Sequence, residues 1–216
     1  MQTELNNPAI IRFLQSKFKS AGFIDGLKIR YRSLICPFIS LIKMVQPGDN
    51  VGDVGCGSGQ FMLLVSEFAT PSYVYGIEIS DRLVKNANEL FATLPRGYYD
   101  FEQYDGVKFP AKIAEMDIVF LVDVLHHVPA TSQADFIKGL AATMKPGARL
   151  VLKDINAASP LVYCNKMHDL IFAGEIGNEL KMNDARQLLE ANGLKIIQQE
   201  KRRMYVYPHY TLVAQK

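Results

Sequence analysis

Short apolar runs alternate with amphipathic stretches from about residue 50 onward. Apolar runs of this length are typical of strands that are covered on both faces of a sheet. The fourth run, 117–122, shows the pattern clearly, because every residue after Asp117 is apolar. The five strands predicted in this part of the chain are 51–54, 73–79, 98–104, 117–122 and 148–153.

The intervening stretches carry apolar residues at helical spacing. Phe61, Leu64 and Val65 share one face of such a helix, and Ser80 is a plausible N-cap for the next one. Residues 8–45 are also predicted to be helical, in two pieces separated by Gly22 and Gly26. The other predicted helices are 61–68, 80–94, about 136–144, 161–172 and 183–192.

Strands that alternate with helices imply right-handed crossovers and parallel pairing. The end of the chain differs, because only a short turn separates the strand-like runs 194–201 and 205–213. The predicted fold class is α/β, a three-layer sandwich with a seven-stranded, mostly parallel sheet and an antiparallel C-terminal strand pair. We expect a single domain with four parts: an N-terminal helical cap (1–46), a core (47–153), a lid insertion (154–182), and the last helix with the antiparallel strands (183–216).

Composition narrows the class of protein. A length of 216 residues with 49% hydrophobic content suits one globular domain. The net charge of +2 gives no global attraction for nucleic acid or anionic membranes. Three cysteines without metal-ligand spacing favour a reduced, cytoplasmic protein. The most apolar stretch, Leu34–Val45, has about half of the ~20 residues that span a bilayer. We therefore expect no transmembrane segment, and this stretch to be core, acceptor-pocket wall or membrane-interfacial.

A glycine-rich loop follows the first predicted strand and opens a helix. It reads Asp53-Val-Gly55-Cys-Gly57-Ser-Gly59, and its glycines allow a tight turn and close approach to a ligand. A dinucleotide loop needs the spacing G-x-G-x-x-G, whose last position would fall on Gln60 or Met62. Neither is glycine, so the loop does not match that class.

Acidic residues stand at the carboxyl ends of the predicted strands, where parallel sheets bind ligands. Glu78 follows Gly59 by 19 residues, a distance at which a carboxylate accepts hydrogen bonds from a ribose. Four carboxylates around one cleft would repel a pyrophosphate, but they suit a ribose, an ammonium group and a sulfonium. S-adenosylmethionine has all three. For Asp105 and Asp123 the alternative is a solvated loop acid. The four acidic residues are Asp53, Glu78, Asp105 and Asp123.

Five motifs in order resemble the class I S-adenosylmethionine-dependent methyltransferases, in particular the small-molecule branch called methyltransferase type 11. They are VGDVGCGSGQF, YGIEIS, FEQYDG, MDIVFLVDVLHHVP and MKPGARLVLKDI, within about residues 47–155. The resemblance implies a Rossmann-like methyltransferase fold, with 47–153 as the cofactor-binding core. It also implies S-adenosyl-L-methionine as cofactor and S-adenosyl-L-homocysteine as product. Gly52 departs from the pattern, which usually has a large apolar residue there.

The resemblance also implies roles for individual residues. The glycines would wrap the methionine part, and Asp53 would hold its amino end directly or through water. Glu78 would bind both ribose hydroxyls, Asp105 would reach the adenine, and Asp123 would line the methionine end. The full set of implied cofactor-binding residues is Asp53, Gly55, Cys56, Gly57, Gly59, Glu78, Ile79, Asp105, Gly106, Asp123 and Val124.

A general base is needed only if the acceptor loses a proton. His126 and His127 follow the fourth strand, and His168 lies in the predicted lid helix. Our hypothesis is that His126 and His168 flank the acceptor, while packing roles for His126 and His127 and a solvated surface position for His168 remain open. The histidines lack metal-ligand spacing, and a catalytic role for Cys56 or Cys164 is not expected.

The acceptor is constrained mainly by what the motifs lack. No N/D-P-P-Y/F signature follows strand four and no Pro-Cys nucleophile is present, which leaves a small organic acceptor. Aromatic residues in the lid and C-terminus favour an apolar or aromatic acceptor, with O-methylation preferred over C-methylation. Alternatives are a non-catalytic S-adenosylmethionine-binding sensor or assembly factor, and an RNA or protein methyltransferase. The aromatic residues are Tyr163, Phe172, Tyr205, Tyr207 and Tyr210.

Two basic clusters suggest partners. Either both are solvated surface, or they dock an anionic partner such as an acyl carrier protein that carries the acceptor, a phosphorylated substrate or lipid headgroups. No nucleic acid partner is expected, and the oligomeric state stays open. The clusters are Lys17, Lys19, Lys28, Arg30 and Arg32 near the start and Lys201, Arg202 and Arg203 near the end.

Overall fold

Seven strands form one sheet in the order β3-β2-β1-β4-β5-β7-β6. This computed structural model describes residues 5–17, 35–95, 97–172, 174 and 176–216. The first five strands pair in parallel, whereas β7 is antiparallel to both β5 and β6. The predicted fold class is therefore confirmed. The strands are β1 (Asn50–Val54), β2 (Tyr73–Glu78), β3 (Tyr99–Gln103), β4 (Ile118–Val122), β5 (Arg149–Ile155), β6 (Lys195–Met204) and β7 (Tyr207–Gln215).

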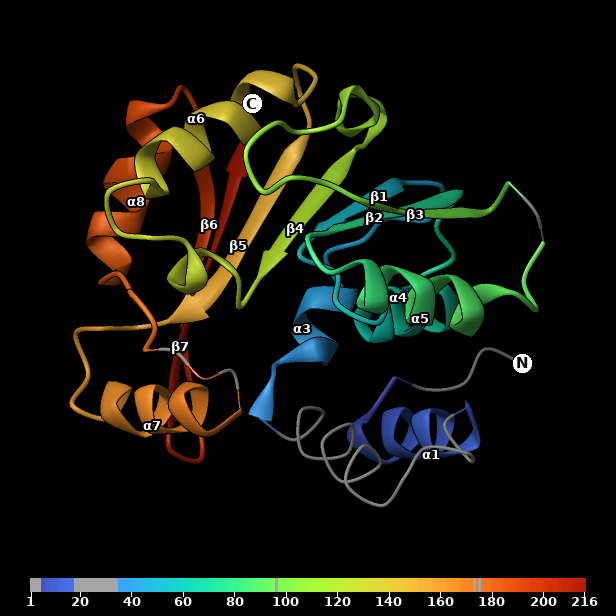
Figure 1. The fold of residues 1–216 in the computed structure, drawn as a ribbon, viewed down its shortest axis with the longest axis horizontal. Coiled ribbons are helices and arrows are strands. Elements are labelled where there is room, and N and C mark those ends of the chain that lie inside the picture. The colour runs from blue at the N-terminus through green and yellow to red at the C-terminus, as the bar shows by residue number, and fades with distance from the viewer. Residues whose placement is uncertain (1–4, 18–34, 96, 173, 175) are drawn as a thin grey trace.

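Helices cover both faces of the sheet (Figure 1). On one face, α1 (Asn7–Lys17), α3 (Phe38–Ile42), α4 (Gln60–Phe68) and α5 (Asp81–Phe91) contribute to one buried apolar cluster. On the other face, α6 (Gln133–Thr143), α8 (Met182–Ala191) and the short 3-10 helices η1 (Ala111–Glu115) and η2 (Leu125–His127) contribute to a second cluster. All five residues of β4 are buried, as expected for a central parallel strand. The continuous apolar pattern of this strand is thus explained by helices that cover both faces of the sheet.

The segment after β5 forms α7 (Val162–Phe172), which packs against β7. Figure 1 shows α7 and α3 at the end of the sheet toward which β4 and β5 point. Parallel α/β sheets bind their ligands at this end. The lid insertion predicted at 154–182 thus lies where an acceptor would approach, and its role as a lid stays a prediction.

The apolar stretch Leu34–Val45 belongs to the core in its described part. Phe38, Leu41 and Ile42 are each at most 1% exposed and pack in the cluster beneath α4. Its membrane-interfacial alternative is therefore wrong for these residues. Residues 18–34, which include Leu34 and most of the first basic cluster, lie outside the described part of the chain.

Two of the aromatic residues near the C-terminus fill the core. Tyr207 and Tyr210 are 4% and 1% exposed, and each packs in a buried apolar cluster. These two side chains therefore fill the core, whereas Tyr163 and Tyr205 are exposed, and the apolar or aromatic acceptor stays a prediction. The residues of the second basic cluster are exposed on β6, the edge strand of the sheet. Charged side chains on an edge strand oppose pairing with other chains.

Candidate active site

The glycine loop bends in the left-handed backbone region at three positions. Gly55, Gly57 and Gly59 have φ angles of 75°, 56° and 77°. The amides of Gly55 and Cys56 both donate to the carbonyl of Ile77, which ties the loop to β2. Residues that carry a side chain rarely adopt this backbone conformation, so the turn itself requires the three glycines.

Two of these glycines differ in what surrounds them. A Cβ at Gly55 would lie 2.5 Å from Cγ2 of Val124, so Val124 closes the loop from the side of β4. A Cβ at Gly57 would meet no heavy atom of the described chain within 4 Å. The backbone at Gly57 therefore borders open space, as a loop that receives a ligand requires.

Glu78 is held beside this loop at the end of β2. Its Oε2 accepts a hydrogen bond from the amide of Gly57 at 3.0 Å, and its Oε1 accepts from Ile79 and Ser80 at 2.9 and 3.1 Å. The residue is 8% exposed. Ser80 occupies the N-cap position of α5, but its side chain makes no capping bond there. Carboxylate oxygens accept more than one hydrogen bond, so Glu78 retains the capacity to bind hydroxyl groups.

Other predicted cofactor residues lie around the same loop. Asp53 is buried in β1, and burial together with Asp53 and Glu78 raises the pKa of the Cys56 thiol. Ile79 is 61% exposed, although it is large and apolar, and the Cβ position of Gly106 is 3.5 Å from it. An exposed apolar side chain beside a glycine offers a flat surface that suits an adenine ring.

Asp105 makes bonds within its own turn. Its Oδ1 accepts from the amides of Val107 and Lys108 at 2.8 and 2.7 Å, which lowers the pKa of the carboxyl group. This position is compatible with a solvated loop acid and with a residue that reaches the adenine, so both alternatives stay open for Asp105.

Asp123 differs from the other acids, because a lysine neutralises it. Lys153 on β5 places Nζ 2.5 Å from Oδ1 of Asp123, and the lysine side chain is 1% exposed. The charge argument made from four carboxylates therefore does not apply to Asp123, and for the other three it stays a prediction. Lys153 was missed in the sequence, although a lysine inside an apolar strand is a signal for a buried ion pair.

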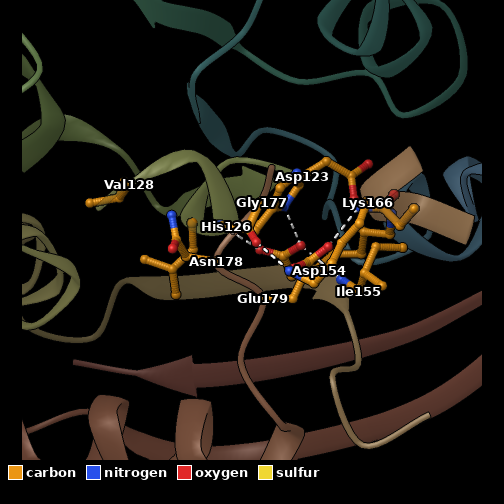
Figure 2. Close-up of polar contacts among 12 residues, drawn as sticks. Asp123, His126, Val128, Asp154, Ile155, Lys166, Gly177, Asn178 and Glu179 are labelled. Carbon is orange, nitrogen blue, oxygen red and sulfur yellow. Dashed lines mark hydrogen bonds and ion pairs between the residues drawn. The ribbon is translucent and has the colours of Figure 1, made fainter. Parts of the chain in front are cut away.

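His126 forms a buried pair with Asp154 (Figure 2). Its Nδ1 is 2.6 Å from Oδ1 of Asp154, and its amide donates to Oδ2 at 3.1 Å. The imidazole is 3% exposed and the carboxylate 1%. An ionised carboxylate only accepts hydrogen bonds, so the proton of the neutral ring lies on Nδ1 and its lone pair on Nε2. Asp154 was also missed, because it lies 28 residues from His126.

The segment before α8 covers this pair. Asn178 donates its amide to the carbonyl of His126 at 2.6 Å, and Gln133 donates to the carbonyls of Leu125 and Asn178. A Cβ at Gly177 would lie 2.9 Å from Cδ2 of His126. This segment therefore fixes η2 and the histidine that it carries.

The other two candidate histidines are placed differently. His127 is exposed, and its ring centre lies 4.0 Å from that of His126. His168 lies on α7, but its side chain is outside the described part of the structure. Whether His126 and His168 flank an acceptor therefore stays a prediction. Among the described residues, no group of three His, Cys, Asp or Glu side chains could hold a metal ion.

Residues 27–199 match a family model described as a methyltransferase domain. The match spans most of the chain, so the chain belongs to this family. A 27-O-demethylrifamycin SV methyltransferase from Amycolatopsis mediterranei is 32% identical over 111 residues, which cover 51% of this chain and 40% of that protein. O-methyltransferase cnsE from Penicillium expansum is 28% identical over 153 residues, which cover 69% of this chain and 53% of that protein. The chain thus spans about half the length of these curated relatives.

Solved structures show the same fold. Magnesium protoporphyrin IX methyltransferase (ChlM) from Synechocystis PCC 6803, crystallised with bound S-adenosylhomocysteine, superposes with a TM-score of 0.69 at 23% identity and covers 93% of both chains. The family match shows a methyltransferase domain, and the shared fold agrees with the predicted class I methyltransferase architecture. The open space at Gly57, the carboxylate of Glu78 and the exposed Ile79 fit S-adenosylmethionine. No helix in the described ranges is both long and apolar enough to cross a membrane.

Proposed function

We propose that the protein transfers a methyl group from S-adenosylmethionine to a hydroxyl group of a small, apolar or aromatic acceptor, with His126 as general base. The observation that carries this proposal is the buried pair of His126 and Asp154 at the carboxyl ends of β4 and β5. A hydroxyl is a weak nucleophile until it loses its proton. A histidine with a carboxylate on Nδ1 is suited to accept that proton on Nε2.

Each part of the site has one task in this account. Glu78 accepts the ribose hydroxyls, Gly57 gives the ligand room, and Ile79 covers the adenine. When bound, the cofactor would supply an activated methyl group to the acceptor oxygen and would leave as S-adenosylhomocysteine. His126 takes the hydroxyl proton, and Asp154 stabilises the imidazolium that results. The protein otherwise contributes orientation and exclusion of water.

The relatives support oxygen as the atom that is methylated. One of the two relatives described above is named an O-methyltransferase, and the other is named a methyltransferase of 27-O-demethylrifamycin SV. C-methylation remains the second candidate, and an acceptor tethered to an acyl carrier protein is part of the proposal. The cytoplasmic location expected from the cysteines also stays a prediction.

The test is methyl transfer from radiolabelled S-adenosylmethionine into fractions of a cell extract, with release of S-adenosylhomocysteine measured in parallel. We expect label in the small-molecule fraction. His126→Asn and Asp154→Asn should each lower kcat by about 10²–10⁴-fold, the usual contribution of a general base. The exposed neighbour His127→Asn is the matched control and should retain activity.

Other results would select the alternatives. Cofactor binding without product in any fraction would contradict transfer and favour a sensor or assembly factor. Label in RNA or protein would contradict a small acceptor. If His126→Asn kept the full rate while binding S-adenosylhomocysteine normally, base catalysis by this residue would be wrong. Titration with S-adenosylhomocysteine checks that each variant is folded.

A further inference from the structure

The outward side of α7 is apolar, although it faces solvent. Tyr163, Met167 and Ile171 are 71%, 62% and 68% exposed, and Leu170 between them is 54% exposed. At 100° per residue, these four positions fall within a stripe about 100° wide on the helix. The solvent side of a surface helix is normally polar, so this stripe needs a partner.

The opposite side of α7 is fixed to the protein. Val162 packs in a buried cluster with Ile155 and Tyr207. Lys166 donates to Oε2 of Glu179 at 2.5 Å, and Asn165 donates to Oε1 of the same carboxylate at 3.1 Å. These contacts hold α7 in one rotation about its axis, so its apolar stripe stays outward.

The turn between β6 and β7 extends this apolar surface. Tyr205 and Val206 in the turn are 73% and 43% exposed. The β5–β7 pairing ends with Ile155 opposite His209, whereas the β6–β7 pairing continues to Met204 opposite Tyr207, so the hairpin projects beyond β5. Figure 1 shows the hairpin end at the same end of the molecule as α7. Seven of the ten large hydrophobic side chains exposed in the described part of the chain lie on α7, at Ile176 just after it, or in this turn.

Basic residues lie immediately beside the turn. Lys201, Arg202 and Arg203 are exposed on β6, and the one acid of this strand, Glu200, pairs with Arg202 at 3.0 Å. Strand β6 contains four basic residues and one acidic residue, a net charge of +3. Helix α7 adds no net charge, because it holds one lysine and one aspartate. Apolar and tyrosine side chains flanked by basic ones are the pattern of a surface that binds anionic lipid.

We propose that the outer face of α7 and the β6–β7 turn bind the surface of an anionic lipid bilayer. The apolar stripe would enter the headgroup region, while Lys201, Arg202 and Arg203 would contact lipid phosphates. A second copy of the chain fits less well, because a two-fold contact through this patch would bring the basic residues of both copies together. The proposal concerns binding and stands apart from methyl transfer.

Vesicle flotation tests this proposal. The purified protein is mixed with vesicles of phosphatidylcholine alone or of phosphatidylcholine with phosphatidylglycerol, at low and high salt. We expect binding to the anionic vesicles, weakened by salt because the headgroup contacts are screened. The double variant Leu170→Ser, Ile171→Ser should lower the apparent affinity by about tenfold or more. Val107→Ser, at an apolar position 80% exposed on another part of the surface, is its matched control and should bind as the wild type does.

A second variant separates charge from apolar contact. Lys201→Gln with Arg203→Gln should weaken binding to anionic vesicles and reduce its dependence on salt. Lys195→Gln, at the other end of β6, should change binding much less. The proposal is overturned if the wild type floats with neither kind of vesicle. It is also overturned if both double variants bind the anionic vesicles as the wild type does. A dimer in light scattering that Leu170→Ser, Ile171→Ser dissociates would overturn it too, because the stripe would then contact a second copy. Circular dichroism and titration with S-adenosylhomocysteine confirm that the variants are folded.

Discussion

The ammonium group of Lys153 lies 2.5 Å from the carboxylate of Asp123, where the neighbouring strands β4 and β5 end. Lys153 is almost fully buried, whereas the side chain of Asp123 is 25% exposed. Burial alone would lower the pKa of Lys153, but the attraction of Asp123 outweighs it and the pKa is raised. Asp123 also has a left-handed φ of 56°, and its amide donates to the carbonyl of Lys153. The pair therefore fixes the backbone between β4 and the segment that carries His126.

Removing Asp123 should lower the free energy of unfolding more than removing Lys153 does. Asp123→Asn leaves a buried ammonium without its counter-charge and should lower the free energy of unfolding by about 3–5 kcal/mol. Lys153→Met leaves a carboxylate that water can reach, so its cost should be smaller. Urea unfolding of the two variants and of the double variant measures this. Equal stability of Asp123→Asn and the wild type would show that the pair contributes nothing.

His209 should make the protein sensitive to acid. Burial, with a smaller effect from Lys153, lowers the pKa of His209 to about 4, below its usual 6.5. The unfolded chain therefore binds this proton more tightly than the folded one. The corresponding stability is complete above pH 6.5 and is lost as the pH falls toward 4. At pH 5 the loss from this one group is about 2 kcal/mol.

The variant His209→Gln isolates this contribution. Nε2 of His209 donates to the carbonyl of Ile35 at 2.7 Å, and a glutamine amide can donate to the same oxygen without titrating. We measure the free energy of unfolding in urea at pH 7.5 and at pH 5. The drop in this free energy between the two pH values should be about 2 kcal/mol smaller in the variant than in the wild type. An unchanged pH dependence would mean that His209 does not titrate as inferred.

Gly55 and Val124 should be coupled. Alanine at position 55 combines a left-handed φ with a contact of 2.5 Å to Val124, so Gly55→Ala should cost about 2–4 kcal/mol of stability from strain and overpacking. Adding Val124→Ala removes the clash and should restore part of that loss. Gly57→Ala meets no such contact. It should cost only the backbone strain, about 1–2 kcal/mol, and should mainly weaken binding of S-adenosylhomocysteine. Stability of Gly55→Ala equal to that of the wild type would contradict the packing described.

Cys56 should be chemically inert despite its place in the glycine loop. Burial, followed by the charges of Asp53 and Glu78, raises the pKa of its thiol. The reactive thiolate is therefore scarce at neutral pH. Cys164, which is half-buried, should be alkylated by iodoacetamide before Cys56. Mass spectrometry of the labelled peptides checks this order, and faster labelling of Cys56 would contradict it.

The sheet and its helices follow from local pattern. The apolar run at β4 and the turn signals around β6 and β7 fix their type and order, because burial on both faces and a short connection leave few alternatives. Most predicted boundaries lie within a few residues of the observed ones. Helix α3 is shorter than its segment predicted, since Phe38–Ile42 is a five-residue helix inside the core.

The site was predictable only where residues follow one another in the chain. The loop at Gly55–Gly59, Glu78 and His126 could be proposed from the sequence because each stands next to a recognisable strand end. Lys153 and Asp154 were missed because their partners lie 30 and 28 residues away. Spacing along the chain does not report such pairs. A Lys-Asp step inside an apolar strand was the available signal.

The central claim is that this chain binds S-adenosylmethionine through the loop at Gly57 and the carboxylate of Glu78. Calorimetric titration with S-adenosylmethionine tests it, with Glu78→Gln as the variant, because glutamine has a similar size but lacks the charge and keeps only one of the two oxygens that accept hydrogen bonds. We expect a Kd near ~1 µM, about −8.2 kcal/mol. The variant should bind about 10–100-fold more weakly, as loss of charged hydrogen bonds implies. Asp81→Asn, an exposed acid at the start of α5, is the control and should bind as the wild type does. Absence of heat, with no cofactor found by mass spectrometry in the denatured protein, would contradict the account.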